Sequence, residues 1–495
     1  MNNNELLNVW KDWNGSVNCI YSKRIWHAAN IEDASNRLAE KLSEINLEKG
    51  DIVALVLSNT AAFPISLYAL LKLECNPLLL HASTTYYELI KLSSRLPIKC
   101  FIHDFVEEIS TIDSDEINIA FEEQLENIKF TIGVLDILSS AQHREISGAI
   151  LHLTSGTYGN PLVCIRNQFC AVAEAKNYVS SIPTYNNINI MLTTPLNHAF
   201  AYGFGLISAL ITDSTITIDS VFNPKRLLRT MSEHHCDFLT IVPPMAKTFI
   251  DLNRTLPFAT FPSTIFYAGS HCDELTENVF ETELKTKLYA IYGSTETGAI
   301  ASNFSLSKKL PGLGKTLKGV QMRISNTFNY ESLGENIGEV TIKSDSMMQG
   351  YYDSYDPNKE IDFFFTGDIG SVNKSIVKLS GRIREIINKG GLKIDPKEIE
   401  NILLTYPNIV DAVVYPGDTE SGEEIILAAL VVEKEINISQ LRNFCLHHLT
   451  PFKLPAKFYI LDELPKTASG KYLKIKLPCF SNSIVQRSKN HVEST

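Results

Sequence analysis

The chain lacks the cysteine pattern of proteins that depend on disulfides or zinc. Its 495 residues contain nine cysteines, an odd number, and no C-x-x-C pair occurs among them. Disulfide frameworks use an even number of cysteines, and structural zinc sites use closely spaced ones. The pattern therefore argues against both kinds of site and predicts a protein of the reducing cytoplasm.

Long apolar runs and an excess of positive charge are also missing. The longest apolar stretches, such as Ile425–Val432, have the length of a strand, whereas a membrane-spanning helix needs roughly 18 apolar residues. The first ten residues hold neither the basic nor the apolar segment of a signal peptide. A net charge of −11 makes the chain a poor candidate for nucleic-acid binding. We therefore expect no membrane span and no nucleic-acid partner.

The negative charge is unevenly distributed along the chain. From Gly381 onward, 15 Lys and Arg stand against 14 Asp and Glu, a net of +1, so the first 380 residues carry −12. Within Lys453–Lys476, six lysines face only two acidic residues. Such a stretch is either a solvated basic face or a surface that meets phosphates or an acidic partner.

The pattern that is present is that of a large α/β protein. Between about residues 30 and 290, amphipathic helical segments alternate with short, buried-looking strands, which is typical of mostly parallel sheets covered by helices. Over 310–380 short strands separated by Gly, Asn and Asp predict an antiparallel, barrel-like subdomain. The predicted fold class is therefore α/β, with a large N-terminal domain over 1–380 and a small α+β domain over 385–495.

The segment LHLTSGTYGNP at residues 151–161 runs from a strand into a loop of hydroxyl side chains and glycines. Glycine lets backbone N–H groups approach a ligand closely, so such a loop can wrap phosphate oxygens. It is not the G-x-x-x-x-G-K-[ST] loop of the P-loop nucleoside triphosphatases. Taken alone, a loop of this composition is more often a plain turn.

Four further segments strengthen the interpretation of that loop as a phosphate-binding site. They are IYGSTETG at 291–298, FTGDIG at 365–370, GRIREIINKGGLKIDPKEIE at 381–400 and LPKTASGK at 464–471. In this order and spacing, the five segments resemble the adenylate-forming (AMP-binding) superfamily of acyl- and aryl-CoA synthetases, adenylation domains and luciferases. The resemblance runs from about residue 30 to about residue 476. It implies an adenylation core over 1–380, a hinge over 381–384 and a mobile C-terminal lid domain over 385–495.

The resemblance also implies roles for individual residues. Those that match the flexible phosphate loop are Thr154, Ser155, Gly156, Thr157 and Gly159. Those that match the nucleoside site are Tyr292 and Gly293 beside adenine, Gly269 and Ser270 on its other wall, and Asp368 with Arg382 at the ribose hydroxyls. Those that match the reaction centre are Thr295 at the α-phosphate, Glu296 at Mg²⁺ and the adenylating lysine Lys471. The hinge position falls on Arg384.

Adenylate formation needs groups of these kinds. A carboxylate attacks the α-phosphorus of ATP, and negative charge accumulates on the phosphate oxygens. Mg²⁺ and a lysine neutralise that charge, and donors fixed in place stabilise it without reorganising. The cofactors that the resemblance implies are therefore ATP and Mg²⁺.

The phosphate loop departs from the family pattern T-S-G-T-T-G-x-P-K at two positions. Tyr158 replaces a threonine and Leu162 replaces the lysine, which weakens the case for loop contact with the β- and γ-phosphates. Arg166 is the nearest basic residue downstream, and it is a candidate to compensate for the missing lysine.

The segment PLNHAFAYGFG at residues 195–205 resembles the part of the family that lines the acid pocket, and Tyr267 is a further pocket candidate. Members that activate α-amino acids place an Asp in this segment, and hydroxybenzoate-activating members place an Asn after the histidine. Here Ala199 follows His198, and an alanine can bind neither an amine nor a ring hydroxyl. Because burying an unpaired ammonium is costly, we expect an acid without an α-amino group: fatty, short-chain or simple aromatic.

The expected acceptor is a thiol, either of coenzyme A or of the phosphopantetheine on a discrete carrier protein. The basic stretch Lys453–Lys476 would suit the phosphates of the first or an acidic helix of the second. Two other interpretations stay open: an adenylating enzyme that makes an amide or ester, and a nucleotide-binding pseudoenzyme, suggested by Leu162. Retention of the four residues Glu296, Asp368, Arg382 and Lys471 argues against the pseudoenzyme.

We expect Lys471→Ala to lower adenylate formation by about 10²–10³-fold, because the lysine supplies charge while pyrophosphate leaves. Thiol transfer from preformed acyl-adenylate should stay largely intact. The first step is measured as acid-dependent exchange of labelled pyrophosphate into ATP, the second as single-turnover transfer. Equal losses in the two half-reactions would contradict the role of Lys471.

Overall fold

The structure is a computed structural model, and it divides into two compact units. The first holds Met1–Ala82, Leu92–Leu153 and Val163–Ile383, and the second holds Ser83–Lys91, Thr154–Leu162 and Arg384–Thr495. The residues described are 4–104, 117–125, 128–135, 144–154, 162–255, 261–262, 264–269, 272, 274–325, 338–373, 375–382, 387–389, 392–394, 396–419, 423–465 and 477–479. The main division between the units falls at the predicted hinge, whose movement stays a prediction.

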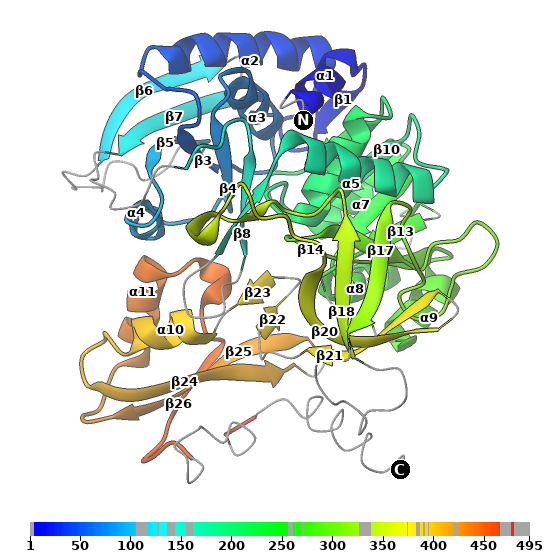
Figure 1. Cartoon of the computed structure of the whole chain (residues 1–495). Helices are drawn as coiled ribbons and strands as arrows, with labels where there is room; N and C mark the ends of the chain where they lie inside the picture. Colours follow the sequence, from blue (N-terminus) through cyan, green and yellow to red (C-terminus); the bar gives the residue numbers. More distant parts are fainter. Residues whose placement is uncertain are drawn as a thin grey trace. The chain divides into compact units, whose positions relative to one another are not determined.

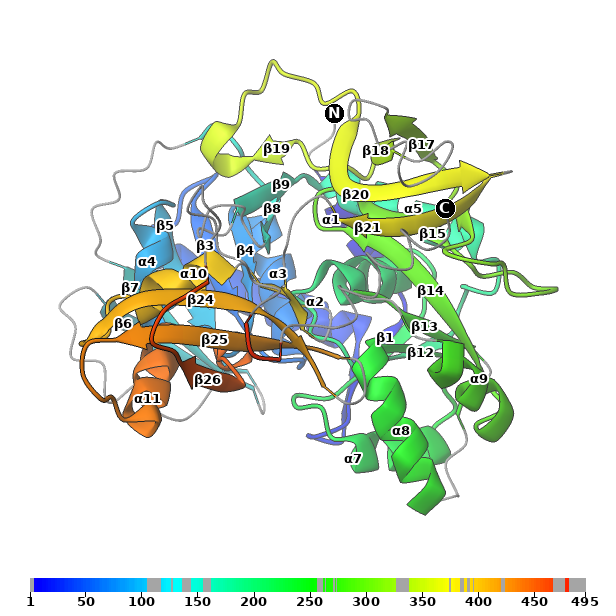
Figure 2. The same cartoon turned by 90° about the horizontal axis from the view of Figure 1, so that it is seen from below.

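The larger sheet of the first unit changes from parallel to antiparallel across its width. β10 to β14 are parallel neighbours, whereas the pairs from β14 through β21 are antiparallel. Figure 2 shows β20 and β21 side by side. In spatial order the strands are β17 Val320–Ser325, β18 Gly338–Ser344, β20 Phe364–Asn373, β21 Ile376–Arg382, β16 Lys315–Thr316, β15 Gly298–Ser302, β14 Lys287–Ser294, β13 Thr264–Tyr267, β12 Phe238–Ile241, β10 Asn189–Leu192, β11 Thr215–Ile218, β1 Ser16–Cys19 and β2 Arg24–His27.

The second sheet is parallel at its centre and antiparallel at one end. β3 pairs in parallel with β4 and β5, β4 pairs in parallel with β8, and β7 pairs antiparallel with β5 and β6. In spatial order its strands are β19 Gly350–Tyr351, β9 Leu162–Arg166, β8 Ile150–Thr154, β4 Asn76–Leu80, β3 Ile52–Val56, β5 Ile98–His103, β7 Ile128–Leu135 and β6 Ile117–Leu125. Strands β3 and β4 are buried along their whole length, as in a parallel sheet that is covered on both faces.

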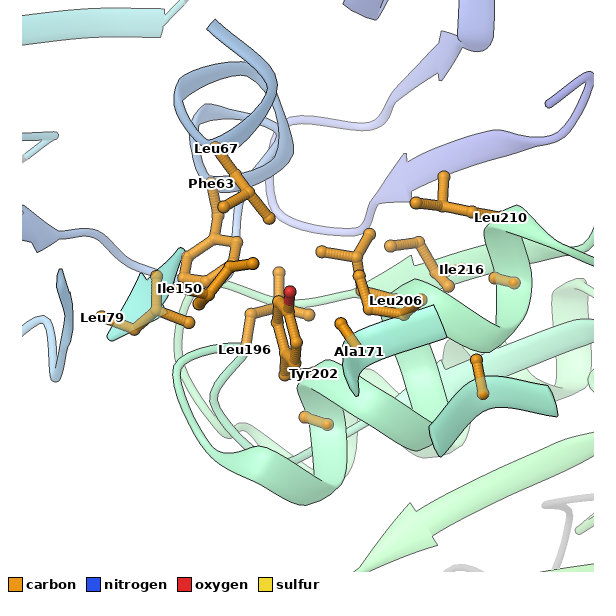
Figure 3. Packing of buried hydrophobic residues seen from close by; sticks show 14 of the residues in the cluster. Phe63, Leu67, Leu79, Ile150, Ala171, Leu196, Tyr202, Leu206, Leu210 and Ile216 are labelled. Carbon is orange, nitrogen blue, oxygen red and sulfur yellow. The ribbon is translucent and has the colours of Figure 1, made fainter. Parts of the chain in front are cut away.

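Helices pack against these sheets and fill the space between them. They are α1 Glu5–Asp12, α2 Ala28–Ser43, α3 Ala62–Lys72, α5 Gln168–Ser181, the π-helix η2 Ala201–Ile207 with α6 Ser208–Leu210, α7 Pro224–Glu233, α8 Pro243–Thr255 and α9 Glu274–Glu283. Helix α4 Tyr86–Ser93 belongs mostly to the second unit. Figure 1 shows α2 beside α3. In Figure 3, Phe63 and Leu67 of α3 face Leu79, Ile150 and Tyr202, so one apolar core joins the two sheets.

The smaller unit is an α+β structure with its own apolar core. A three-stranded sheet pairs β25 antiparallel with β24 and parallel with β26. Its elements are β22 Ile387–Lys389, β23 Leu392–Ile394, α10 Pro396–Leu403, β24 Ile409–Asp418, β25 Glu424–Val432, α11 Ile438–His448 and β26 Lys457–Ile460. Ile399, Leu403 and Leu441 of the two helices pack on Val414 and Ala428 of the sheet.

The α/β fold class that the sequence predicts is confirmed, but the sheets are mixed rather than mostly parallel. The strands β16, β17, β18, β20 and β21 of the predicted barrel-like subdomain are antiparallel as expected and continue the larger sheet. The alternation of strands predicted between about residues 30 and 290 includes the apolar runs at 52–57, 77–80 and 264–267, which form β3, β4 and β13. Helix α1 and the β6–β7 pair were not predicted, because they lie outside the strand–helix alternation. Among the described helices, none has the length and apolarity that crossing a bilayer requires.

We expect Leu38→Ala to lower the free energy of unfolding by about 2–5 kcal/mol, because it empties space in a packed core. Leu38 lies on α2 and is completely buried. The neighbouring Arg37→Ala is the control: the Arg37–Asp33 pair is exposed, so its loss should change stability by less than about 0.5 kcal/mol. Urea denaturation measures both, and equal effects would contradict the assigned core.

Candidate active site

Three segments that the sequence places in the site follow the carboxyl ends of neighbouring parallel strands. β10 leads toward His198 and Ala199, β13 toward Gly269, and β14 toward Thr295 and Glu296. Because these strands are parallel within one sheet, their carboxyl ends lie at one edge, which is where ligands bind in open α/β sheets. The acid segment, the adenine wall and the turn that carries Glu296 therefore share one edge of the sheet.

Tyr292 and Asp368, the residues matched to adenine and ribose, are bonded to each other. The Tyr292 Oη donates to the Asp368 Oδ2 over 2.7 Å, although the two residues are 76 positions apart. Both are buried, at 8% and 4% exposure. In the sheet, Asp368 of β20 pairs with Arg382 of β21. The sequence resemblance implied a nucleoside role for each residue, but it did not indicate the bond that orients the carboxylate.

Glu296 lies on the turn between β14 and β15, and a residue that sequence reasoning missed contacts it. The Tyr351 Oη donates to the Glu296 Oε1 over 3.2 Å, and the Met348 amide donates to the Glu296 carbonyl over 2.7 Å. Tyr351 belongs to β19, a two-residue strand paired with β9. A Gly-Tyr pair after a short strand is too weak a signal to have identified it.

Several predicted site residues lie partly or wholly outside the described residues. Thr154 ends β8 and Leu162 begins β9, so the structure places both ends of the phosphate loop. The residues that lie outside are Ser155, Gly156, Thr157, Tyr158, Gly159, Ser270, Arg384 and Lys471, together with the side chain of Arg382. Their roles stay predictions.

Arg166 does not replace the missing phosphate-loop lysine, so that hypothesis is wrong. Its side chain is 1% exposed and lies at the end of β9, where Nη2 is 2.8 Å from the Glu174 Oε2. The same nitrogen donates to the Ser346 carbonyl over 2.9 Å. A guanidinium that is buried and already paired with a carboxylate is not available to β- or γ-phosphate.

A second histidine, His81, lies near enough to His198 of the acid segment to influence its titration. Burial, and then the nearby His81, which follows β4, lower the pKa of His198 to about 4. Burial also lowers the pKa of His81. Both imidazoles are therefore mostly neutral at pH 7, and a neutral imidazole carries one N–H donor. Ala199 is partly buried and η2 begins two residues later.

Tyr267 lies in the core beside α9. Only 4% of it is exposed, and its Oη donates to the Glu277 Oε1 over 2.8 Å. Burial, and then the Glu277 carboxylate, raise the pKa of Tyr267. Its hydroxyl is therefore engaged by α9, and a pocket role for its ring stays a prediction.

The Mg²⁺ role of Glu296 also stays a prediction. Across the residues that the structure describes, no three His, Cys, Asp or Glu side chains are grouped to hold a metal ion. A single partly exposed carboxylate nevertheless fits Mg²⁺, because this ion is usually held by one or two carboxylates together with substrate phosphates.

The basic stretch of the smaller unit is only partly a free charged surface. The Lys453 Nζ lies 2.8 Å from the Glu398 Oε1, and its side chain is 18% exposed. Lys453 is therefore a poor phosphate ligand, which corrects the prediction that counted it with the acceptor site. Lys457 is exposed, with its Nζ 4.9 Å from the centre of the Tyr459 ring. The remaining lysines of the stretch lie outside the described residues.

Known proteins resemble the chain over nearly its whole length. The AMP-binding enzyme family matches residues 10–352, and the AMP-binding enzyme C-terminal domain matches residues 398–471. The oxalate–CoA ligase of Arabidopsis thaliana is 28% identical over 480 residues, 90% of this chain and 91% of that protein. The 2-succinylbenzoate–CoA ligase of Bacillus subtilis (strain 168) is 26% identical over 479 residues, 92% and 94% of the two chains. A solved o-succinylbenzoate CoA synthetase from Bacillus subtilis has a TM-score of 0.78 at 22% identity, over 95% of this chain and 97% of that one.

We expect Tyr351→Phe to lower the kcat of acid-dependent pyrophosphate exchange by about tenfold, since hydrogen bonds to charged groups contribute about 1.5–3 kcal/mol. The matched control is Tyr352→Phe, which removes a hydroxyl from the next residue, itself 3% exposed. Exchange rates of the two purified variants are compared with wild type. If both variants lose activity alike, or neither does, the Tyr351–Glu296 bond does not position the carboxylate.

Proposed function

The chain belongs to the AMP-binding enzyme family, in which it is an AMP-forming acid–CoA ligase, and we propose that its acid carries a second acidic group and no α-amino group. The single observation that carries the choice of acid is Ala199, which has no polar group and follows one of two half-buried neutral histidines, His81 and His198. The arguments for the reaction and for the acid are separate.

In the proposed reaction, a substrate carboxylate oxygen attacks the α-phosphorus of ATP and pyrophosphate leaves. The thiol of coenzyme A then attacks the acyl carbonyl of the adenylate, and AMP leaves. The bonded pair Tyr292 and Asp368 receives the nucleoside, while Thr295 and Glu296 face the phosphates. Mg²⁺ supplies charge neutralisation when bound, and Lys471 supplies the positive charge of adenylation.

The surroundings of His198 favour an anion over an ammonium. The groups that shift its pKa are its own burial and His81, and the adjacent Ala199 has no counter-charge to offer. An unpaired ammonium in such a place would be costly, whereas the neutral imidazole of His198 can turn an N–H donor toward a carboxylate. The site therefore suits an acid with a second negative group better than an α-amino acid.

The names of the two curated relatives agree with this choice. Oxalate and 2-succinylbenzoate, the acids in those names, each carry two carboxyl groups. We therefore narrow the range of fatty, short-chain or simple aromatic acids to short or aryl dicarboxylates. A carrier-protein thiol remains the alternative acceptor, and a transfer assay with each thiol separates the two.

We expect kcat/KM for pyrophosphate exchange to be at least tenfold higher with one of oxalate, malonate, succinate or 2-succinylbenzoate than with its matched monoacid. The matched monoacids are acetate, propionate, butyrate and benzoate. The physical basis is one or two hydrogen bonds to a charged carboxylate, each about 1.5–3 kcal/mol. His81→Leu should reduce this preference while leaving exchange with the monoacids within about threefold of wild type. Highest activity with a monoacid or with any α-amino acid would contradict the proposed acid.

A further inference from the structure

A fully buried ion pair contacts the segments on either side of the Glu296 turn. Arg166 ends β9 and Glu174 lies in α5; each side chain is 1% exposed, and 2.8 Å separates the Arg166 Nη2 from the Glu174 Oε2. Removing two charges from water costs more than their attraction returns unless further hydrogen bonds satisfy them. Here the Arg166 Nε and Nη1 have no hydrogen-bond partner among the described residues. The pair is therefore a poor source of stability, and its other contacts indicate its role.

The arginine side of the pair reaches the turn that carries Glu296. The Arg166 Nη2 donates to the Ser346 carbonyl over 2.9 Å. The Ser346 hydroxyl in turn donates to the carbonyl of Thr297, the residue after Glu296, over 2.8 Å. One residue thus links the guanidinium to the turn.

The glutamate side of the pair contacts the start of β15, the strand that follows the same turn. The Glu174 Oε1 accepts a hydrogen bond from the Ala299 amide over 3.2 Å. A Cβ on Gly298, whose φ is +68°, would lie 2.9 Å from the Glu174 Cδ and 3.1 Å from the Arg166 Nη2. Gly298 is therefore required both by its backbone conformation and by the closeness of the two charged groups.

The strand that leaves the phosphate loop is joined to this arrangement through the same segment. The Gln349 amide donates to the Ile165 carbonyl over 2.8 Å, and the Met348 amide donates to the Glu296 carbonyl over 2.7 Å. The segment Ser346–Tyr351 consequently lies between β9 and the Glu296 turn and bonds to both. Arg166, at the end of β9, is also joined to the strand after this turn, because its partner Glu174 accepts the Ala299 amide.

We propose that Arg166 and Glu174 are a positioning pair for adenylate formation, which fixes the Thr295–Glu296 turn against the strand that leaves the phosphate loop. This role rests on the proposed function, since it assigns the pair to the adenylation half-reaction. The pair touches no substrate, and it acts through Ser346, Ala299 and Gly298. Directional bonds from two charged groups define this geometry where apolar packing would leave it loose.

The test replaces the pair by apolar residues of similar length, Arg166→Met with Glu174→Leu. Such replacements of buried ion pairs are often neutral or stabilising, so the double variant should unfold near the wild-type midpoint. Its kcat for acid-dependent pyrophosphate exchange should fall about 10- to 100-fold, because small misplacements of reacting groups cost rate on that scale. Single-turnover transfer from preformed acyl-adenylate to coenzyme A should stay within about threefold of wild type. A purely structural role would not separate the half-reactions.

A milder variant tests the same link without removing charge. Ser346→Ala keeps the carbonyl that Arg166 binds and deletes the hydroxyl that bonds to Thr297. It should lower pyrophosphate exchange several-fold and leave thiol transfer unchanged. This variant decides the question if the double variant does not fold.

Two control variants separate positioning from charge loss and from instability. Glu283→Gln breaks the exposed Arg254–Glu283 pair, at 2.7 Å, and should leave exchange unchanged. Leu38→Ala destabilises the core, so it should lower the unfolding midpoint without changing the ratio of the half-reactions. All rates are measured well below each unfolding midpoint.

The outcomes distinguish this role from the proposed function. The positioning role is wrong if the double variant or Ser346→Ala keeps exchange within twofold of wild type, or if both half-reactions fall together. If none of the acids tested supports pyrophosphate exchange by the wild-type protein, the ligase function itself fails, and the role of the pair fails with it.

Discussion

The arrangement of the site depends on one buried contact, the ion pair of Arg166 and Glu174. The guanidinium bonds to Ser346, the carboxylate accepts the Ala299 amide, and Gly298 leaves room for both. These contacts join segments that lie up to 180 residues apart in the sequence. An apolar core can bring two sheets together, but it does not fix which atom of one loop faces which atom of another. Charged side chains that are buried and directionally bonded do so.

The general plan of the fold and the motif-bearing strands could be predicted from sequence because the relevant signals are local. A buried parallel strand is a continuous apolar run, and β3, β4 and β13 show it. The edge at which His198, Gly269 and Glu296 gather follows from that parallel order, since each lies just after the carboxyl end of its strand. The five motifs further indicated which of these segments carry nucleotide chemistry.

The contacts between segments could not be predicted, because partners distant in sequence leave no local pattern. The sequence alone indicates that Arg166 and Lys453 are free cations. In the fold, Arg166 lies beside Glu174 and Lys453 lies beside Glu398. The Tyr351–Glu296 bond depends on a two-residue strand that no periodicity reveals. Sequence shows the sign of a charge, whereas its availability depends on burial and on partners from elsewhere in the chain.

The carboxylate of Glu174 occupies space that two other positions must leave empty. A Cβ at Gly203, in η2, would lie 2.5 Å from the Glu174 Cδ, and a Cβ at Gly298 would lie 2.9 Å from it. A larger residue at Gly203 would need a shorter side chain at position 174, and a shorter side chain there leaves Arg166 without its counter-charge. At Gly298 the φ of +68° adds a second restriction. Positions 166, 174 and 203 are therefore expected to change together in divergent sequences, around a glycine at 298 that stays fixed.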